Sequence, residues 1–267
     1  MNRSRRLPSW ATGIVGIAIV IALWWISAVT VFANVGPAKV GAIPTPLEVV
    51  QQIGADGFGY YWGHISVTLS EAAMGFVWGN GLALLLAGLV LLVPRIEKVA
   101  VQIAVITYCI PIVAIGPIAK IVIGSPDPGD PAGTAIFLAA LAVFFTTVIG
   151  SLLGLKAADQ ASLDVVSVYG GGKWMQLRKV RIVAAIPAVL TALKISAPAA
   201  LLGAIIAEYL GGVERGLGLA MLAAGSAAQV DRVWGLAIVS GLVAGLGYAL
   251  FGLISRFATP WSSGRSA

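Results

Sequence analysis

The chain has 267 residues, of which 59% are hydrophobic and only 10% are charged, and its mean hydropathy is +0.96. Soluble domains carry about 25% charged residues, so this composition excludes a water-soluble globular protein. The net charge of +6 is compatible with nucleic-acid binding. In a membrane protein, however, the positions of Lys and Arg report topology, and we expect no nucleic-acid partner. One cysteine, Cys109, and one histidine, His64, leave no disulfide pair and no Cys/His cluster for a metal.

Six apolar segments follow one another along the chain, and each is long enough to cross about 30 Å of hydrocarbon, which takes roughly 20 helical residues. They cover residues 11–33, 65–93, 99–123, 133–154, 183–210 and 233–257. The first segment follows three arginines as in a signal peptide, but it is too long for the apolar part of one, so we expect an uncleaved span. The sequence predicts an all-α polytopic membrane protein with a transmembrane domain at 11–257, an N-terminal segment 1–10 and a C-terminal tail 258–267.

Lys and Arg are distributed unevenly among the segments that join these spans. One set of alternate segments contains Arg3, Arg5, Arg6, Arg95, Lys98, Lys156, Lys173, Arg178, Lys179, Arg181, Arg256 and Arg265. The other set contains only Lys39, Lys120, Arg215 and Arg232. Because cytoplasmic segments carry an excess of Lys and Arg, we predict that the first set is cytoplasmic and that both termini lie inside.

Two of the predicted outer segments are rich in proline. Residues 43–46 (Ile-Pro-Thr-Pro) predict a stiff turn that opens a short amphipathic helix at the membrane surface, and residues 125–131 predict a second turn. Glycines four residues apart within the spans predict close helix packing, unless they only reflect the high frequency of glycine in membrane helices. The pairs are Gly75 and Gly79, Gly150 and Gly154, and Gly241 and Gly245.

The longest predicted cytoplasmic segment, residues 155–181, is positively charged and also patterned. Apolar or small residues recur at helical spacing from Leu163 to Leu177, and three consecutive glycines at 170–172 interrupt them. This pattern predicts a helix, a sharp glycine turn and a second helix. An exposed Trp and Tyr on such a helix indicate a docking surface, although a solvated basic surface that only enforces topology is the alternative.

This segment resembles the cytoplasmic loop of ATP-binding-cassette importer permeases, which has the pattern Glu-Ala-Ala, three residues, Gly. Residues 164–166 (Asp-Val-Val) take the place of Glu-Ala-Ala, Gly170 lies at the family spacing, and residues 173–174 (Lys-Trp) resemble the Arg-Trp that follows. The two valines depart from the family, as do residues 182–183 (Ile-Val), where the family has Leu-Pro. These departures weaken the motif but leave its glycine and its basic face.

The resemblance covers about residues 43–257 and is to the sulfonate, taurine and nitrate permease branch. The segments that carry it are 43–50, 110–114, 144–147, 207–209 and 216–218. It implies the type I importer permease fold, a location in a bacterial inner membrane, and a translocation path for a small solute delivered by an external solute-binding protein. It also implies a second permease chain, identical or sister, and a partner ATPase dimer that binds ATP and Mg²⁺, with no cofactor in this chain.

In that family the loop inserts a coupling helix into a groove on the ATPase subunit. The resemblance therefore implies an ATPase-coupling site. Its residues here are Asp164, Val166, Tyr169, Gly170, Gly171, Gly172, Lys173, Trp174, Leu177 and Arg178.

Motifs that could indicate catalysis fail on residue identity. The Gly-Gly-Gly-Lys at 170–173 is not a phosphate-binding loop, because Ser167 and Trp174 stand where that loop needs a glycine and a hydroxyl residue. A literal Glu-Ala-Ala at 71–73 lacks the loop glycine, since Val77 stands there, and it belongs to the second apolar segment. The lone histidine has no Ser/Asp partners at a plausible spacing, so we expect a transport subunit and not an enzyme.

For the translocation path we predict the aromatics, hydroxyls and helix-distorting proline of the third and fourth spans, although core packing explains each of them equally well. They are Tyr108, Pro111, Ile112, Phe144, Phe145, Thr146 and Thr147. Lys194 and Glu208 of the fifth span are added because ionisable groups inside spans are costly. Lys194 could attract an anionic substrate, or it could snorkel or pair with a neighbouring helix.

The substrate class stays open between sulfonates, taurine, nitrate, carboxylates and pyrimidine vitamin precursors, all of which are carried by similar permeases. The alternative function is a secondary transporter driven by an ion gradient, which predicts inverted repeats and charges at mid-membrane. A membrane-embedded enzyme is a second alternative, and it requires paired carboxylates or a His cluster.

Overall fold

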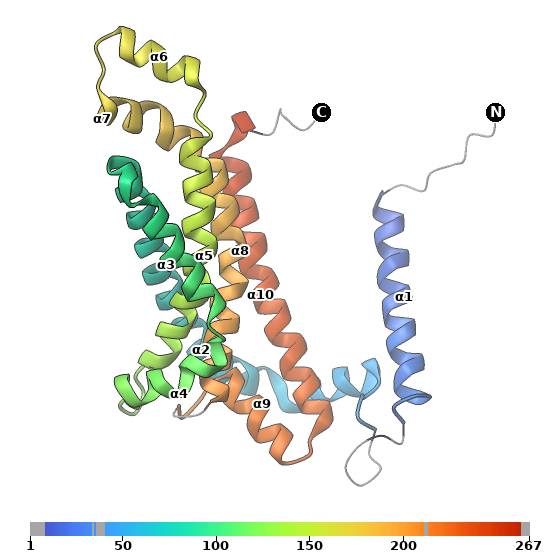
Figure 1. Ribbon diagram of the computed structural model, residues 1–267. Helices are drawn as coiled ribbons and strands as arrows, with labels where there is room; N and C mark the ends of the chain where they lie inside the picture. The colour runs from blue at the N-terminus through green and yellow to red at the C-terminus, as the bar shows by residue number, and fades with distance from the viewer. Residues whose placement is uncertain (1–8, 34, 36–40, 211–212, 263–267) are drawn as a thin grey trace, which may run out of the picture. The chain divides into compact units, whose positions relative to one another are not determined.

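A computed structural model describes residues 9–33, 35, 41–210 and 213–262 (Figure 1). The predictions for Arg3, Arg5, Arg6, Lys39 and Arg265 lie outside these residues. Within them, every regular element is a helix, which confirms the all-α prediction. The elements are α1 (Ser9–Val29), α2 (Pro46–Leu92), η2 (Pro94–Ile96), α3 (Glu97–Cys109), α4 (Ile112–Ile123), α5 (Gly133–Lys156), α6 (Gln160–Val168), α7 (Lys173–Gln176), the π-helical turn η3 (Leu177–Arg181), α8 (Ile182–Tyr209), α9 (Leu217–Ser226), α10 (Val230–Ala258) and η4 (Pro260–Ser262).

Five of the described helices are long and apolar enough to cross a membrane. Four of them are α1, α2, α5 and α10, and the fifth runs from Lys173 through α8 to Tyr209. A bent pair formed by 94–109 and 112–123 adds a sixth candidate. The chain is therefore a multi-pass membrane protein, as its composition predicts.

The third predicted span, 99–123, differs from a straight helix. Its two halves, α3 and α4, meet at an angle of 95°. Pro111 has no N–H to continue the helical hydrogen bonds, and Ile110, the residue before it, takes the extended conformation (φ −75°, ψ 124°) that a following proline favours.

The chain divides into two compact units, and α2, α9 and α10 contribute residues to both. Unit 1 comprises Met1–Trp62 and Ala220–Val239, and unit 2 comprises Gly63–Leu219 and Ser240–Ala267.

In unit 1, the first residues of α2 carry a capping box. The hydroxyl of Thr45 accepts from the Glu48 N–H at 3.3 Å, while the Glu48 carboxylate accepts from the Thr45 N–H at 2.6 Å. Pro46 occupies the first helical position, where its missing N–H costs nothing. The helix then breaks at Gly57, whose φ of 75° is unfavourable for other residues. The turn predicted at 43–46 therefore opens a helical segment that ends at Gly57.

Small residues allow the helices of unit 2 to pack closely, and α5 and α8 are in extensive contact. A Cβ added at Gly79 would lie 2.5 Å from Val143 Cγ2 on α5, and one at Gly154 would lie 2.7 Å from Ala188 Cβ on α8. Gly75 and Gly150 are similarly tight. Gly241 and Gly245 on α10 meet nothing within 4 Å, so the packing predicted for that pair is not made by the described part of this chain.

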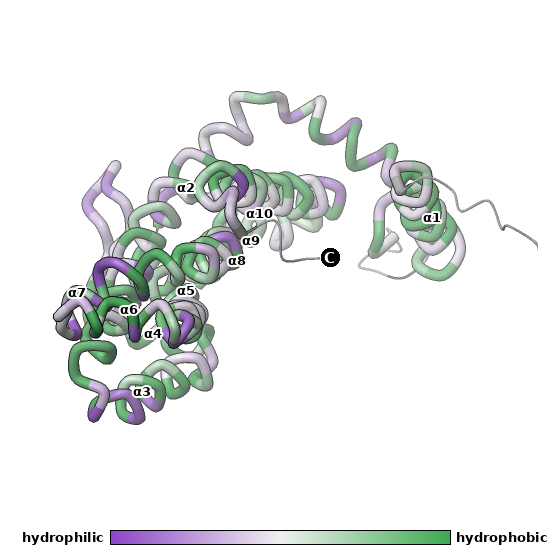
Figure 2. The backbone as a smooth tube through the Cα atoms, turned by 90° about the horizontal axis from the view of Figure 1, so that it is seen from above, coloured by the Kyte–Doolittle hydropathy of each residue, from purple (hydrophilic) through white to green (hydrophobic). Residues whose placement is uncertain are grey.

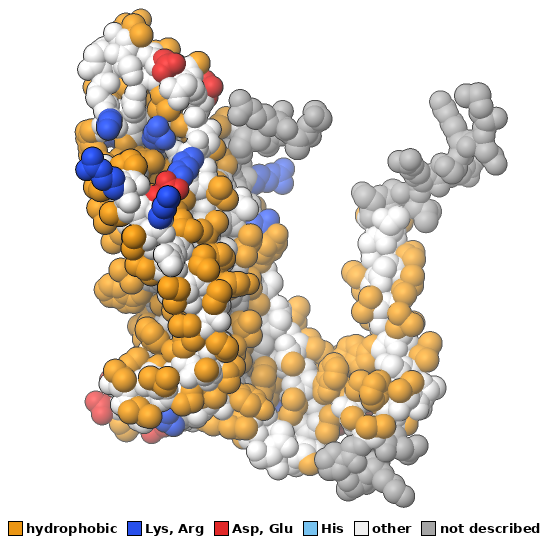
Figure 3. All heavy atoms as spheres, viewed as in Figure 1, with side chains coloured by type: hydrophobic (Ala, Val, Ile, Leu, Met, Phe, Trp, Pro, Cys, Tyr) orange, Lys and Arg blue, Asp and Glu red, His pale blue; other side chains and the backbone are white. Residues whose placement is uncertain are grey.

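The two ends of unit 2 differ in polarity. Figure 3 shows Lys and Arg side chains gathered at the end that carries α6 and α7, where Lys156, Lys173 and Arg181 line a common hollow. Figure 2 shows hydrophilic residues in α6, α7 and the start of α3, and mostly hydrophobic residues along the long helices.

Candidate functional site

The predicted coupling loop consists of α6, a glycine turn and α7. Gly170 has φ 79°, and its N–H donates to the Ser167 carbonyl at 2.9 Å, while the Gly171 N–H donates to the Val166 carbonyl at 2.8 Å. These two bonds form a Schellman motif, which ends a helix on a left-handed glycine. A Cβ added at Gly171 would lie 2.5 Å from Val166 Cγ1. The turn therefore needs glycine at both positions.

Side-chain hydrogen bonds fasten α6 to α7. The amide of Gln176 donates to the Leu163 carbonyl at 3.2 Å and to the Ser167 hydroxyl at 2.8 Å. The Asp159 carboxylate caps the start of α6 by accepting from the Ser162 N–H at 3.3 Å. This loop is therefore an ordered helix–turn–helix.

Several apolar side chains of this helix–turn–helix face outward. Tyr169 is 86% exposed, Val168 84% and Trp174 65%. Together with the exposed Val165 and Met175, they form a surface that we call the loop patch. Exposed apolar groups gathered at one site are typical of protein–protein contacts.

The other predicted coupling residues surround this patch or support it from below. Asp164 is exposed and accepts from the Gln160 amide at 2.9 Å. Lys173, Arg178 and Gly172 are exposed, Val166 is half-buried, and Leu177 is buried.

Where the helix–turn–helix joins the long helices, a hollow of about 260 Å³ is lined by residues of α2, α5, α7 and η3. An ion pair between Lys156 and Glu97 joins α5 to α3 there.

Three predicted path residues meet at the bend between α3 and α4. Tyr108, Pro111 and Ile112 line a hollow of about 370 Å³ together with residues of α5 and α8. The ring of Phe145 on α5 stacks on Tyr108 with 4.6 Å between the centroids. An irregular backbone segment at membrane depth is tolerated where it lines a cavity.

The remaining residues of the fourth predicted span are placed differently. Phe144 packs with Phe145 against a buried apolar cluster, and Thr146 is half-buried. Thr147 is fully buried, and its hydroxyl donates to the Asn80 side chain and lies 2.9 Å from the Ser196 hydroxyl. This polar network joins α2, α5 and α8 inside unit 2.

The two ionisable candidates of the fifth predicted span lie apart from the hollow at the bend. The Lys194 Nζ lies 4.2 Å from the ring centroid of Tyr248 on α10, a cation–π contact with a neighbouring helix. Glu208 is fully buried near the end of α8. The structure thus brings together Tyr108, Pro111, Ile112 and Phe145, but not Thr147, Lys194 or Glu208.

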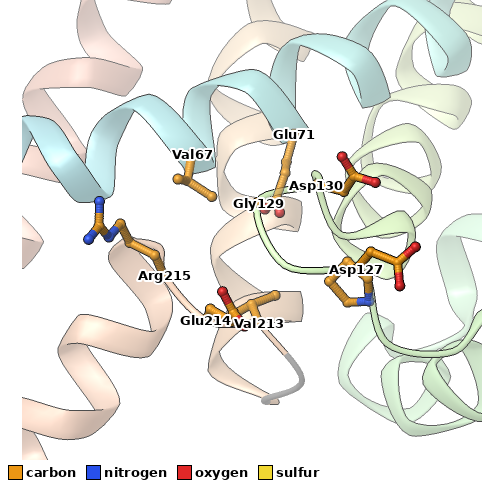
Figure 4. A pocket seen from close by; sticks show the side chains of 9 residues that line it. Val67, Glu71, Asp127, Gly129, Asp130, Val213, Glu214 and Arg215 are labelled. Carbon is orange, nitrogen blue, oxygen red and sulfur yellow. The ribbon is translucent and has the colours of Figure 1, made fainter.

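A third hollow lies at the end of unit 2 opposite the coupling loop and was not predicted. It measures about 460 Å³ and is lined by acidic residues and one arginine, namely Glu71, Asp127, Asp130, Glu214 and Arg215, with Val67, Pro126, Gly129 and Val213. Figure 4 shows Glu71 reaching from α2 toward the segment that joins α4 to α5. An ionisable residue within an apolar span is the signal that could have identified Glu71.

In the ranges that the structure describes, no three His, Cys, Asp or Glu side chains are placed to hold a metal ion.

Comparison with known proteins gives consistent matches. Residues 79–265 match the model of the family described as binding-protein-dependent transport system inner membrane component. The chain is 30% identical to a probable ABC transporter permease protein of Haemophilus influenzae, over 92% of this chain and 95% of the relative. It is 26% identical to a putative aliphatic sulfonates transport permease protein of Bacillus subtilis, over 96% and 90%. It is 24% identical to a formylaminopyrimidine transport permease protein of Halalkalibacterium halodurans, over 82% and 85%.

Proposed function

Because the chain belongs to the family of binding-protein-dependent transport system inner membrane components, we propose that residues 155–181 couple it to an ATPase subunit and that the bend between α3 and α4 lines its solute path. The chain is the permease subunit of an ABC importer, and it is not an enzyme. The alternative of an ion-gradient-driven transporter is not favoured.

The loop patch is the observation that carries the proposed coupling site. Tyr169 and Trp174 are exposed on short helices whose mutual position is fixed by the Gln176 hydrogen bonds. Aromatic side chains on a rigid element are the usual anchors of a protein–protein interface. An ATPase subunit that closes on this element would pull on η3 and α8, which follow it without a break.

The proposed assembly follows the arrangement that this family implies. Two permease chains, identical or sister, enclose the path, and two ATPase subunits bind ATP and Mg²⁺. An external solute-binding protein delivers the solute. The Lys and Arg clustered around α6 and α7 support a cytoplasmic loop and cytoplasmic termini in a bacterial inner membrane.

The solute that we propose is a small organic or inorganic anion, such as a sulfonate, taurine, nitrate or a carboxylate, or a pyrimidine vitamin precursor. Two of the relatives carry names that refer to aliphatic sulfonates and to formylaminopyrimidine. The hollow at the bend is lined by Thr107 and Tyr108 among apolar residues. An aromatic ring and hydroxyls suit a small solute that carries polar groups.

The coupling site is tested by Trp174→Ala in the chain co-expressed with its ATPase subunit. Removing an anchor aromatic costs about 2 kcal/mol at an interface hot spot, so we expect roughly tenfold or greater loss of co-purified ATPase and of ATPase activity stimulated by loaded binding protein. Trp62→Ala, which removes a tryptophan that is 52% exposed in unit 1, is the matched control and should leave both unchanged. Equal recovery of the ATPase with Trp174→Ala would contradict the proposed coupling site.

A further inference from the structure

Two carboxyl groups meet inside unit 2, those of Glu71 on α2 and Glu208 on α8. Their exposed fractions are 1% and 0%, and the two carboxyl groups lie close enough to interact with each other. One oxygen of each has a separate donor, because Glu71 Oε1 accepts from the Ala132 N–H at 2.8 Å and Glu208 Oε2 accepts from the Gly218 N–H at 2.6 Å. The second oxygen of each, Glu71 Oε2 and Glu208 Oε1, is buried and has no hydrogen-bond partner among the described residues.

Two ionised carboxylates cannot occupy this position together. Burial removes the water that would solvate each charge, and the two negative charges repel each other. A single proton between them gives one group an O–H donor and leaves the other as its acceptor, so that both second oxygens are satisfied by a short charge-assisted hydrogen bond. We propose that Glu71 and Glu208 bind one proton between them, as a proton-binding site that joins the helices at this end of unit 2.

This site links four helices through two carboxyl groups. Glu71 extends from α2 to the N–H of Ala132, the residue that caps α5. Glu208 extends from α8 to the N–H of Gly218 in the first turn of α9. Negative charge at a helix N-terminus is favourable, and the shared proton connects these two caps into one structure.

The backbone of residues 216–218 lies very close to the Glu208 side chain. A Cβ added at Gly218 would lie 2.9 Å from Glu208 Cβ, and one at Gly216, whose φ is 154°, would meet the Glu208 carboxyl group. The N–H of Leu217 donates to the Thr68 hydroxyl at 2.9 Å, and that hydroxyl donates to the His64 carbonyl at 3.2 Å. The segment 216–218 therefore encloses the carboxyl pair.

The charged groups that face the pair come from three elements. Asp127 and Asp130 lie between α4 and α5, and Glu214 and Arg215 lie between α8 and α9, all lining the same hollow as Glu71. His64 on α2 accepts from the Gly216 N–H at 3.4 Å. Three exposed carboxylates and one guanidinium make the surroundings negative, which favours a bound proton. The hollow of about 460 Å³ in front of Glu71 gives that proton a route to water.

A metal ion fits this position less well than a proton. Mg²⁺ requires six ligands and Ca²⁺ six to eight, whereas the pair offers two oxygens, because backbone N–H groups occupy the other two.

The proton is detected in the purified full-length chain by infrared spectroscopy and by thermal unfolding against pH. We expect an absorption band of a protonated carboxylic acid at neutral pH that disappears in both Glu71→Gln and Glu208→Gln. Each Gln can accept the original backbone N–H through its carbonyl and donate its NH₂ to the remaining carboxylate, so both variants should fold.

The unfolding temperature gives the second readout. Since the native pair holds a proton that the unfolded chain has released, stability falls as the pH rises above the usual range of carboxyl groups, until the pair itself releases the proton. In that window we expect the unfolding temperature of the natural chain to fall by roughly 3 °C per pH unit relative to Glu71→Gln. Asp164→Asn, which removes an exposed carboxylate of α6 outside this hollow, should retain the natural pH dependence and the infrared band.

The result that overturns the proposal is a natural chain without the protonated-acid band and with the same pH profile as Glu71→Gln. Restoration of the high unfolding temperature at alkaline pH by Na⁺, Mg²⁺ or Ca²⁺ would overturn it in favour of a metal site. Neither measurement requires transport or an ATPase subunit, so failure here leaves the proposed coupling function untouched.

Discussion

Gly171 and Gly172 are neighbours in the sequence but have different structural requirements. A Cβ at Gly171 would collide with the side chain and the carbonyl of Val166, whereas one at Gly172 meets nothing within 4 Å. The φ of Gly172, −80°, is open to any residue. The three glycines at 170–172 indicate a turn, but their sequence does not reveal which of them the turn requires.

We predict that Gly171→Ala opens the turn of the coupling loop, while Gly172→Ala does not. Overpacking at such a position costs about 1–3 kcal/mol, enough to make the local structure fluctuate. Limited proteolysis should cut the Gly171→Ala chain between α6 and α7 several times faster than the natural chain, with a parallel loss of co-purified ATPase. Equal proteolysis rates for the two variants would contradict this reading of the turn.

The carboxyl pair shows what a single sequence leaves hidden at the residue scale. Glu208 could be selected as an ionisable group in an apolar span, but its partner Glu71 lies on another helix, and their contact depends on how α2 and α8 pack. The same holds for Thr147, which could be selected by its hydroxyl. Its partners Asn80 and Ser196 come from two other helices.

At the scale of the helices, glycine determines how closely α2 approaches α5. Gly79 contacts Ala140 and Val143 directly, while Gly81, on the same helix, has open space. We predict that Gly79→Leu forces the two helices apart and lowers the unfolding temperature of the detergent-solubilised chain. A cost of at least about 3 kcal/mol is expected, because the clash involves backbone as well as side chains.

Gly81→Leu is the matched control for Gly79→Leu. It adds the same side chain to the same helix without an internal clash, so its unfolding temperature should stay within about 2 °C of the natural value. A comparable fall of the unfolding temperature in both variants would mean that leucine is unfavourable at any glycine of this helix. The contact with α5 would then not be the cause.

The lengths of the apolar segments predicted the long helices well, because a helix that spans a bilayer must have a minimum length and an apolar composition. They did not predict the bend within the third span, because hydropathy averaged over 99–123 contains no information on the direction of the helix. Pro111 lies within that apolar run, and proline often only kinks a membrane helix. The extended backbone of Ile110, which turns the kink into a 95° bend, depends on how α3 and α4 pack against α5.

For the whole molecule, the bent pair of helices at 94–109 and 112–123 determines whether the chain crosses the membrane an odd or an even number of times. If 94–123 crosses the membrane, Lys98 and Ser125 lie on opposite sides, and both termini lie on the same side. We predict that a thiol-reactive reagent that does not cross membranes labels Ser125→Cys in intact cells, and labels Lys98→Cys and Ala161→Cys only after permeabilisation. Cys109 is replaced by Ser in all three variants.

This labelling experiment distinguishes a re-entrant loop at α3 and α4 from an inverted orientation of the whole chain. Labelling of Lys98→Cys together with Ser125→Cys from outside, with Ala161→Cys still protected, would make α3 and α4 a re-entrant loop. Labelling of Ala161→Cys alone would invert the orientation and place the coupling loop outside, which would contradict the proposed ATPase contact.

The position of Cys109 offers an experimental opportunity in spectroscopy. It is the last residue of α3, directly before the bend, it is exposed, and the sequence contains no other thiol. A fluorophore or spin label attached to the natural chain would therefore occupy one defined place without any substitution. Its signal would register a change in the angle between α3 and α4 while the subunit works, in real time and in a native lipid environment.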